Sequence, residues 1–80
     1  MQFVGNRAFY DNNIEVLDME NCSQFERFGK KSFEANDITI FPNCSQSLVH
    51  IDDYAFRGNK LNDIDFSNYT KLERIGDYAF

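Results

Sequence analysis

Several features that would define a fold by themselves are scarce in this sequence. Its 80 residues include two cysteines, one proline and no tryptophan, and neither cysteine belongs to a C-x-x-C or mixed Cys/His pattern. The sequence therefore indicates neither a disulfide-rich scaffold nor a zinc site. No apolar run approaches the roughly 20 residues of a membrane-spanning helix. Residues 1–11 also lack the basic start and apolar stretch of a signal peptide.

Positive charge is scarce as well. Eight Lys and Arg residues stand against 13 Asp and Glu residues, which gives a formal net charge of −5 at pH 7. Because binding to a phosphate backbone needs clustered Lys and Arg, nucleic acid is not an expected partner. The one histidine, His50, has no Ser or Cys nucleophile at a motif-like spacing and shares its repeat position with Arg27 and Arg74. We interpret His50 as a solvent-facing turn residue, and we expect neither an enzyme active site nor a cofactor.

Apolar residues, by contrast, are abundant enough for an ordered core. Hydrophobic residues make up 42% of the chain and aromatic residues 16%, with nine phenylalanines. A chain of this length buries only a modest fraction of its unfolded surface, so a compact core alone would leave it marginally stable. Stacked internal repeats would add the missing cohesion.

The sequence contains such repeats. A segment ending in a small residue and Phe occurs four times, in residues 4–9, 28–33, 51–56 and 75–80, and the phenylalanines are 24, 23 and 24 residues apart. Two stretches, Ile14-x-x-Leu17-x-Met19-x-x-Cys22 and Leu61-x-x-Ile64-x-Phe66-x-x-Tyr69, match the leucine-rich template L-x-x-L-x-L-x-x-N/C. The middle repeat supplies only Ile38-x-Ile40 before Pro42. A full unit reads L-x-x-L-x-L-x-x-C-x-x-L-x-x-I-G-x-x-A-F-x-x-N.

This unit, with its I-G-x-x-A-F segment, resembles the BspA-like (Treponema-type) leucine-rich repeats over essentially the whole chain. The resemblance implies a non-enzymatic protein-binding module of the kind found in surface proteins of mucosa-associated bacteria and protists. It favours cell adhesion or host-protein contact, and a cell-surface or secreted location if a secretion signal precedes Met1. Without such a signal, and with two unpaired cysteines, the alternative is a cytoplasmic leucine-rich repeat scaffold for protein–protein interaction.

We expect a leucine-rich repeat solenoid with short parallel β-strands on its concave side and turns and short helical or 3₁₀ segments on the other side. Strands are predicted where apolar residues alternate, at Leu17-x-Met19, Ile38-x-Ile40 and Ile64-x-Phe66. Bends are expected at Gly5, Gly29 and Gly76. Asp52 replaces glycine in this column of the third repeat and tolerates a left-handed conformation.

Three columns of similar side chains are expected to hold the coils together. Phe9, Phe33, Phe56 and Phe80 would form an aromatic spine, each burying on the order of 150–250 Å². Asn12, Asn36 and Asn59 are interpreted as a structural ladder that satisfies backbone groups where each coil turns. Cys22 and Cys44 occupy equivalent positions, where strands about 4.8 Å apart would permit a bridge. We interpret them as a buried thiol ladder, because free cysteine packs as a small hydrophobic residue.

Residues 1–80 are predicted to form a single array of three or so repeats, each of 23–24 residues. Terminal repeats normally carry polar residues that close the ends of a solenoid, and neither end of this sequence does so. The pattern resumes within a repeat at residue 3 and stops on Phe80. This predicts either a fragment of a longer solenoid or end-to-end self-association through uncapped repeats.

The candidate contact surface consists of acidic residues in the predicted strand segments, which are Glu15, Asp18, Glu20, Asp37, Asp63 and Asp65. Residues 14–20, 37–43 and 61–67 contain no Lys or Arg, so a concave acidic face would attract a basic protein or peptide. The alternative is that outward strand positions are acidic only to keep the sheet soluble. Asp63-x-Asp65 lacks the spaced ligands of a calcium loop, and no metal site is predicted.

Asn21, Asn43 and Asn68 each begin an N-x-S/T glycosylation pattern. The three matches reflect one repeated position rather than three independent signals. They matter only if the protein passes through a eukaryotic secretory route.

Overall fold

Short strands form at the apolar residue that precedes each turn, and the strands of successive repeats pair with one another. In the computed structural model, which describes residues 2–20 and 22–80, the strands are β1 (Gln2–Val4), β2 (Phe25–Phe28), β3 (His50–Ile51) and β4 (Arg74–Ile75). They form one parallel sheet in the order β1-β2-β3-β4. The register aligns Val4 with Phe28, Phe28 with Ile51, and Ile51 with Ile75. Each repeat therefore contributes one strand and stacks on the repeat before it.

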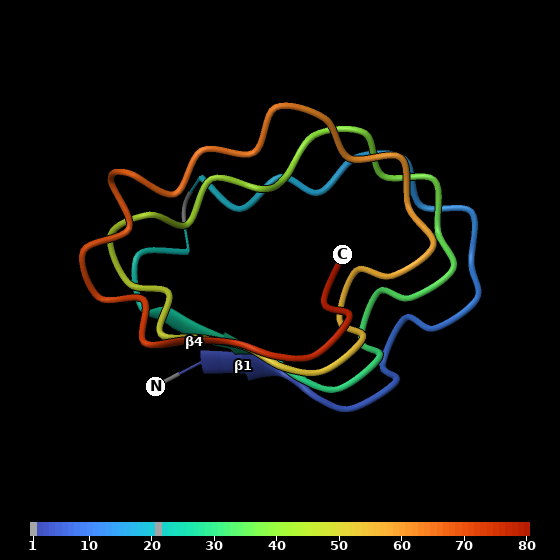
Figure 1. The fold of residues 1–80 in the computed structure, drawn as a ribbon, viewed down its shortest axis with the longest axis horizontal. Helices are drawn as coiled ribbons and strands as arrows, with labels where there is room; N and C mark the ends of the chain where they lie inside the picture. The colour runs from blue at the N-terminus through green and yellow to red at the C-terminus, as the bar shows by residue number, and fades with distance from the viewer. Residues whose placement is uncertain (1, 21) are drawn as a thin grey trace.

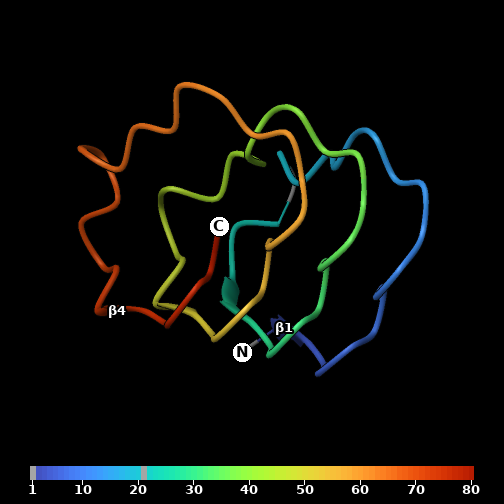
Figure 2. The same ribbon diagram turned by 45° about the vertical axis from the view of Figure 1, so that its right-hand side comes forward.

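Each repeat forms one coil of a solenoid. We name them coil 1 (residues 2–20 and 22–24), coil 2 (25–47), coil 3 (48–71) and coil 4 (72–80). In Figure 1 the coils nearly superimpose as loops, and the turned view of Figure 2 separates them, from coil 1 in blue to coil 4 in red. Coils 2 and 3 each have a neighbour on both sides, whereas coils 1 and 4 have one neighbour each.

A stack of phenylalanine rings runs through the coils on the side of the turns. The ring centroids of successive members are 5.1 Å apart for Phe9 and Phe33, 5.4 Å for Phe33 and Phe56, and 6.0 Å for Phe56 and Phe80. The rings are nearly parallel, with interplanar angles of 9° to 12°. Phe28 is fully buried beside the stack and meets Phe56 edge to face at 4.8 Å. Aromatic contacts between coils thus provide much of the core.

The asparagine column joins adjacent coils through backbone groups. The Asn36 side-chain amide donates to the carbonyl oxygens of Phe9 (2.9 Å) and Phe33 (3.0 Å), and its Oδ1 accepts the Ile14 amide at 3.0 Å. Asn59 repeats this arrangement one coil later, including an accepted bond from Ile38 N–H at 3.0 Å. Each of these two side chains therefore satisfies donors and acceptors of two coils.

The strands do not lie where the alternating apolar residues predict them. Residues 14–20, 37–43 and 61–67 contain no strand in the described chain. This side of the solenoid is joined only at isolated points, such as Asp37 N–H to Ile14 O (2.9 Å) and Lys60 N–H to Ile38 O (3.0 Å). The predicted concave sheet of these segments is therefore wrong, although several of their apolar side chains do pack against the core.

A shortened coil 2 explains why no ladder forms there. Ile38 occupies the column of Ile14, because each donates its amide to the asparagine of the following coil. Phe41, not Ile40, then enters the core and contacts Phe66 at 5.5 Å, while Ile40 is 76% exposed. Coil 2 thus passes through this region with fewer residues than coils 1 and 3. Continuous pairing would require equal lengths, since register in a sheet advances residue by residue.

The turns after the strands also differ from the expected helical or 3₁₀ segment. They are β-turns closed by bonds from Ala8 N–H to Gly5 O, Ser32 N–H to Gly29 O, and Ala55 N–H to Asp52 O. The third residue of each turn is left-handed, with φ of 58° at Arg7, 57° at Lys31, 60° at Tyr54 and 54° at Tyr78. The left-handed conformation therefore falls two positions after the glycine column, and the left-handed backbone considered for Asp52 does not occur. The chain does bend at this column, since Gly5, Gly29 and Asp52 are the first residues of their turns.

Close approach of the preceding coil explains glycine instead. A Cβ on Gly29 would lie 2.7 Å from both Asn6 Oδ1 and the Val4 carbonyl oxygen. A Cβ on Gly76 would collide with Asp53 Oδ1 in the same way. These glycines are required by the coil beneath them and not by their own dihedral angles.

Candidate protein-binding surface

The acidic residues predicted as a contact surface come from three segments that run beside one another. Residues 14–20, 37–43 and 61–67 belong to successive coils and lie together on the side away from the sheet (Figure 1). We call their six carboxylates the acidic surface: Glu15, Asp18, Glu20, Asp37, Asp63 and Asp65. All are exposed except Asp37, which is half-buried. The surface is irregular coil and not the outward face of strands.

Two members of the acidic surface also shape its backbone. Asp18 Oδ1 accepts the Glu20 amide at 3.2 Å, and Asp65 Oδ1 accepts the Ser67 amide at 2.9 Å. The Ser67 backbone amide, helped by its side chain, lowers the pKa of the Asp65 carboxyl from its ordinary value. Asp65 is therefore ionised at neutral pH and held in a fixed orientation.

One positive charge reaches this surface. Lys60 Nζ lies 3.6 Å from Asp37 Oδ1, and the two side chains are 72% and 42% exposed. Lys60 comes directly before the third acidic segment in sequence, so counting charges within the segments misses it. In the described chain the other five carboxylates have no Lys or Arg within 4.0 Å. The surface consequently keeps a strong negative excess.

The sheet carries a mixed row of charges on the opposite side. Arg27, His50 and Arg74 are register partners on β2, β3 and β4. His50 is half-buried within a strand, so its assignment to a turn is wrong. Arg27 donates to Asp52 Oδ2 at 2.7 Å, and Arg74 donates to Asp53 Oδ1 at 3.3 Å.

These groups, together with Lys30, line a shallow depression of ≈ 350 Å³. Each arginine there is matched by a carboxylate of the adjacent coil. The depression therefore has little unbalanced charge with which to attract an ion. Its two ion pairs connect adjacent coils.

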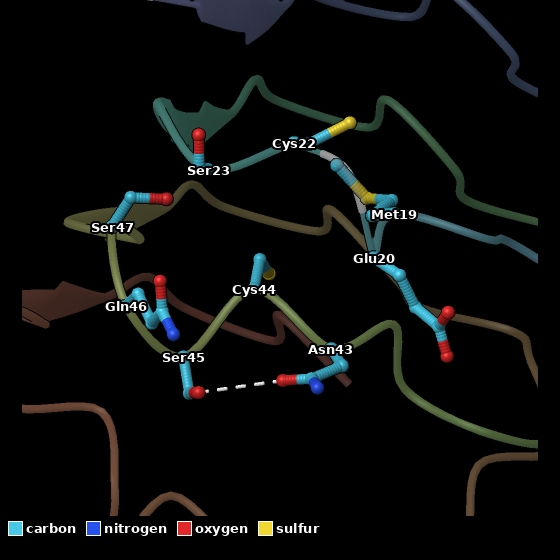
Figure 3. A pocket seen from close by; sticks show the side chains of 9 residues that line it. All are labelled: Met19, Glu20, Cys22, Ser23, Asn43, Cys44, Ser45, Gln46 and Ser47. Atoms are coloured by element: carbon cyan, nitrogen blue, oxygen red, sulfur yellow. Dashed lines mark hydrogen bonds between the residues drawn. The ribbon is translucent and has the colours of Figure 1, made fainter.

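The two thiols flank a small cavity between coils 1 and 2. It has a volume of ≈ 80 Å³ and is lined by Met19, Cys22 and Cys44 among others (Figure 3). Both cysteines are free. Burial, with a smaller contribution from Cys22, raises the pKa of the Cys44 thiol to about 12. Cys44 is thus protonated at neutral pH and packs as an apolar residue, and a cavity this small accommodates water and not a substrate.

Tyr69 stands in the cysteine column in the third repeat, and its hydroxyl reaches coil 2. The Tyr69 hydroxyl donates to the Pro42 carbonyl oxygen at 3.3 Å, and the Cys44 thiol donates to the same oxygen at 3.6 Å. Tyr69 thus adds a bond between coils 2 and 3 at an oxygen that also accepts from Cys44.

The glycosylation patterns lie on the outside of the coils where they can be described. Asn43 and Asn68 are exposed, and the Ser45 hydroxyl donates to Asn43 Oδ1 at 3.3 Å (Figure 3). Asn21 lies outside the described residues.

Stacked coils, one parallel sheet and repeated columns of phenylalanine and asparagine define a repeat solenoid, a class that presents extended surfaces to protein partners. A family model described as "BspA type Leucine rich repeat region (6 copies)" matches residues 1–80. The chain therefore belongs to the BspA-type leucine-rich repeat family, which confirms the resemblance of its repeat unit. No curated protein and no solved structure matches the chain.

Two further observations concern residues 2–20 and 22–80. No helix in these residues has the length and apolar character that crossing a membrane requires. The same residues contain no group of three or more His, Cys, Asp or Glu side chains arranged to hold a metal ion.

Proposed function

We propose that this chain is a non-catalytic module that binds a basic protein or peptide through the acidic surface. Family membership supports a protein partner. The observation that carries the proposal is that six carboxylates from three adjacent coils lie on one side of the solenoid, where one lysine, Lys60, pairs with Asp37. Like-signed charge on one side attracts a complementary partner and orients its approach.

The experiment exploits the turn contacts of Asp18 and Asp65. Asn retains the Oδ1 acceptor of Asp, so a triple variant with Asp18→Asn, Asp63→Asn and Asp65→Asn loses charge while keeping the turns. We expect its affinity for an Arg- and Lys-rich peptide to fall about tenfold. Affinity of the unmodified chain should also fall steeply with added salt. Binding would be measured by isothermal titration calorimetry.

A matched control removes three negative charges elsewhere. The variant Asp11→Asn, Glu26→Gln, Glu73→Gln has the same net charge as the test variant but retains the acidic surface. It should bind the peptide nearly as well as the unmodified chain. Equal losses in the two triple variants, or insensitivity to salt, would reject the acidic surface as the binding site.

Within this proposal, the biological role is cell-surface adhesion or contact with a host protein. The alternative role, an intracellular scaffold, is favoured by the two free thiols, since oxidising compartments convert suitably placed thiols to disulfides. Surface biotinylation of cells carrying the complete gene distinguishes the two. Labelling of intact cells supports adhesion, and labelling only after lysis supports the scaffold.

A further inference from the structure

Two exposed aliphatic side chains lie within the segments that carry the acidic surface. Val16 of coil 1 and Ile40 of coil 2 are 79% and 76% exposed. Each stands four residues after a member of the asparagine column, Asn12 in coil 1 and Asn36 in coil 2. They therefore occupy the same position in successive coils, and we call them the apolar pair.

A backbone hydrogen bond joins the two coils just before the apolar pair. The Asp37 amide donates to the Ile14 carbonyl oxygen at 2.9 Å. Val16 comes two residues after Ile14, and Ile40 comes two residues after Ile38, the equivalent of Ile14 in coil 2. The two aliphatic side chains thus follow a point at which their coils are in direct contact.

The exposure of this position does not depend on a missing neighbour. Ile40 belongs to coil 2, which has coil 1 on one side and coil 3 on the other. Among the described residues of coils 2 and 3, Ile40 is the only large hydrophobic residue that is exposed. Because coils on both sides leave it in water, this position lies on the outside of the solenoid, and Val16 shares it.

Packing of the core does not require an aliphatic residue at this position either. In both coils the next residue, Leu17 or Phe41, is the one that packs against the core. Coil 3 has Asp63 at the same position, and its side chain is exposed. The position therefore accepts a polar residue. Adjacent exposed apolar side chains with a polar surround are typical of a surface that contacts a partner.

Carboxylates surround the apolar pair. Glu15 directly precedes Val16, Asp18 follows it by two residues, and Asp63 occupies the same position in coil 3. In the described chain none of these three carboxylates has a Lys or Arg within 4.0 Å. The same carboxylates repel the anionic headgroups of a lipid surface. A partner that fits this surface combines positive charge with apolar side chains.

We propose that the acidic surface binds a basic amphipathic peptide segment, whose aliphatic side chains pack on Val16 and Ile40 while its Lys and Arg side chains meet the surrounding carboxylates. This inference rests on the proposed function and narrows its partner. The charges attract and orient the partner. The apolar contact adds affinity that salt does not screen, because it depends on the area removed from water. A basic peptide without apolar side chains would use only the charges.

The test compares two peptides of equal length and equal charge by isothermal titration calorimetry. One alternates Lys with Ser, and the other has Leu in place of two successive serines. The unmodified chain should bind the Leu peptide about tenfold more tightly. This preference should persist at high salt although both affinities fall, and the Leu peptide should bind with the more negative heat-capacity change. Equal affinity for the two peptides would overturn the proposal.

A double variant removes the apolar pair and keeps every carboxylate. Val16→Thr with Ile40→Thr retains the branched Cβ at both positions. It should bind both peptides about as tightly as the unmodified chain binds the Ser peptide. Its thermal unfolding should match the unmodified chain, because both side chains are largely in water. A preference for the Leu peptide that survives in this variant would exclude the apolar pair as the contact.

A matched control removes two exposed hydrophobic side chains outside the acidic surface. Phe3 and Tyr10 are 65% and 46% exposed. Phe3→Thr with Tyr10→Thr should retain the preference for the Leu peptide. Loss of the preference in both double variants would mean that the Leu side chains bind without regard to position, and would overturn the proposal.

The variant Asp18→Asn, Asp63→Asn, Asp65→Asn separates this inference from the proposed function. It should weaken the binding of both peptides by a similar factor and leave the preference for the Leu peptide. If this variant binds the Ser peptide weakly but the unmodified chain binds both peptides equally, the proposed function stands and the apolar contact is rejected. Unchanged affinity of this variant for both peptides would reject the proposed function and this inference with it.

Two other occupants of the apolar pair would give different results. A second copy of the chain would produce a dimer in sedimentation velocity that Val16→Thr with Ile40→Thr abolishes. A lipid surface would make the chain sediment with phosphatidylcholine vesicles. Either result would assign the apolar pair to that occupant and overturn the proposal, whereas a monomer that stays in solution and prefers the Leu peptide supports it.

Discussion

Coils 2 and 3 carry many of the same residue types as coils 1 and 4, yet the two pairs differ sharply in burial. Phe33 and Phe56 of the inner coils are 3% and 1% exposed, whereas the equivalent Phe9 and Phe80 are 43–44% exposed. In the sheet, Ile51 is fully buried and Ile75 is 45% exposed. A neighbouring coil on each side accounts for the difference, because the residue itself is unchanged. Stability in this solenoid is thus a property of junctions more than of single repeats.

The largest expected effect comes from breaking the phenylalanine stack at its centre. Phe56→Ala removes a buried ring between Phe33 and Phe80 and should reduce the free energy of unfolding by about 3–5 kcal/mol. Phe9→Ala removes the same ring from an outer coil and should cost about 1–2 kcal/mol. Urea unfolding followed by far-UV circular dichroism measures both. Similar losses would mean that burial by neighbouring coils does not control stability.

The asparagine column provides a second comparison between an inner and an outer coil, with a smaller expected loss of stability. Asn36→Ala leaves the Ile14 amide without its acceptor, whereas the Phe9 and Phe33 carbonyl oxygens keep the bonds from Asn12 and Asn59. The change should cost about 1–3 kcal/mol. Asn12 is exposed and bonds only within its own turn, so Asn12→Ala should cost less than about 0.5 kcal/mol.

Hydrogen exchange gives this prediction a local readout. The Ile14 amide should lose protection in Asn36→Ala, while the Ile38 amide, which donates to Asn59, should keep it. Equal protection of Ile14 in both chains would show that another group replaces the Asn36 side chain.

The columns explain how far the sequence could predict this fold. Phe9, Phe33, Phe56 and Phe80 recur at a fixed period, and a solenoid with one coil per repeat follows from that period alone. The sheet could not be placed, because alternation of apolar residues reports side-chain direction and not whether neighbouring backbones are in register. Coil 2 is shorter than its neighbours before Phe41, and this difference in length prevents strand pairing at the predicted position. The role of glycine was equally hidden, since Gly29 and Gly76 respond to atoms of a different coil.

The charge of the acidic surface could likewise be predicted only in part from the sequence. The sequence groups its six carboxylates by segment, because successive coils repeat the same path. It misses Lys60, which lies just outside a segment boundary and reaches Asp37 only when coils 2 and 3 stack. Charge on a repeat surface must therefore be counted across coils.

The smallest expected effect has the opposite sign and concerns a defect in an inner coil. Ser32 is fully buried in a column otherwise occupied by Ala8, Ala55 and Ala79, and its hydroxyl finds no hydrogen-bond partner among the described residues. A buried hydroxyl without a partner is destabilising, so Ser32→Ala should raise the free energy of unfolding by about 1 kcal/mol. The reverse change at the equivalent buried position, Ala55→Ser, should lower the free energy of unfolding by about 1–2 kcal/mol. Ala8→Ser in exposed coil 1 should change it by less than about 0.5 kcal/mol.

Urea unfolding of the three variants measures these differences. A loss of stability in Ser32→Ala would show that the hydroxyl is paired in solution, and an equal cost for both serine insertions would remove the distinction between inner and outer coils.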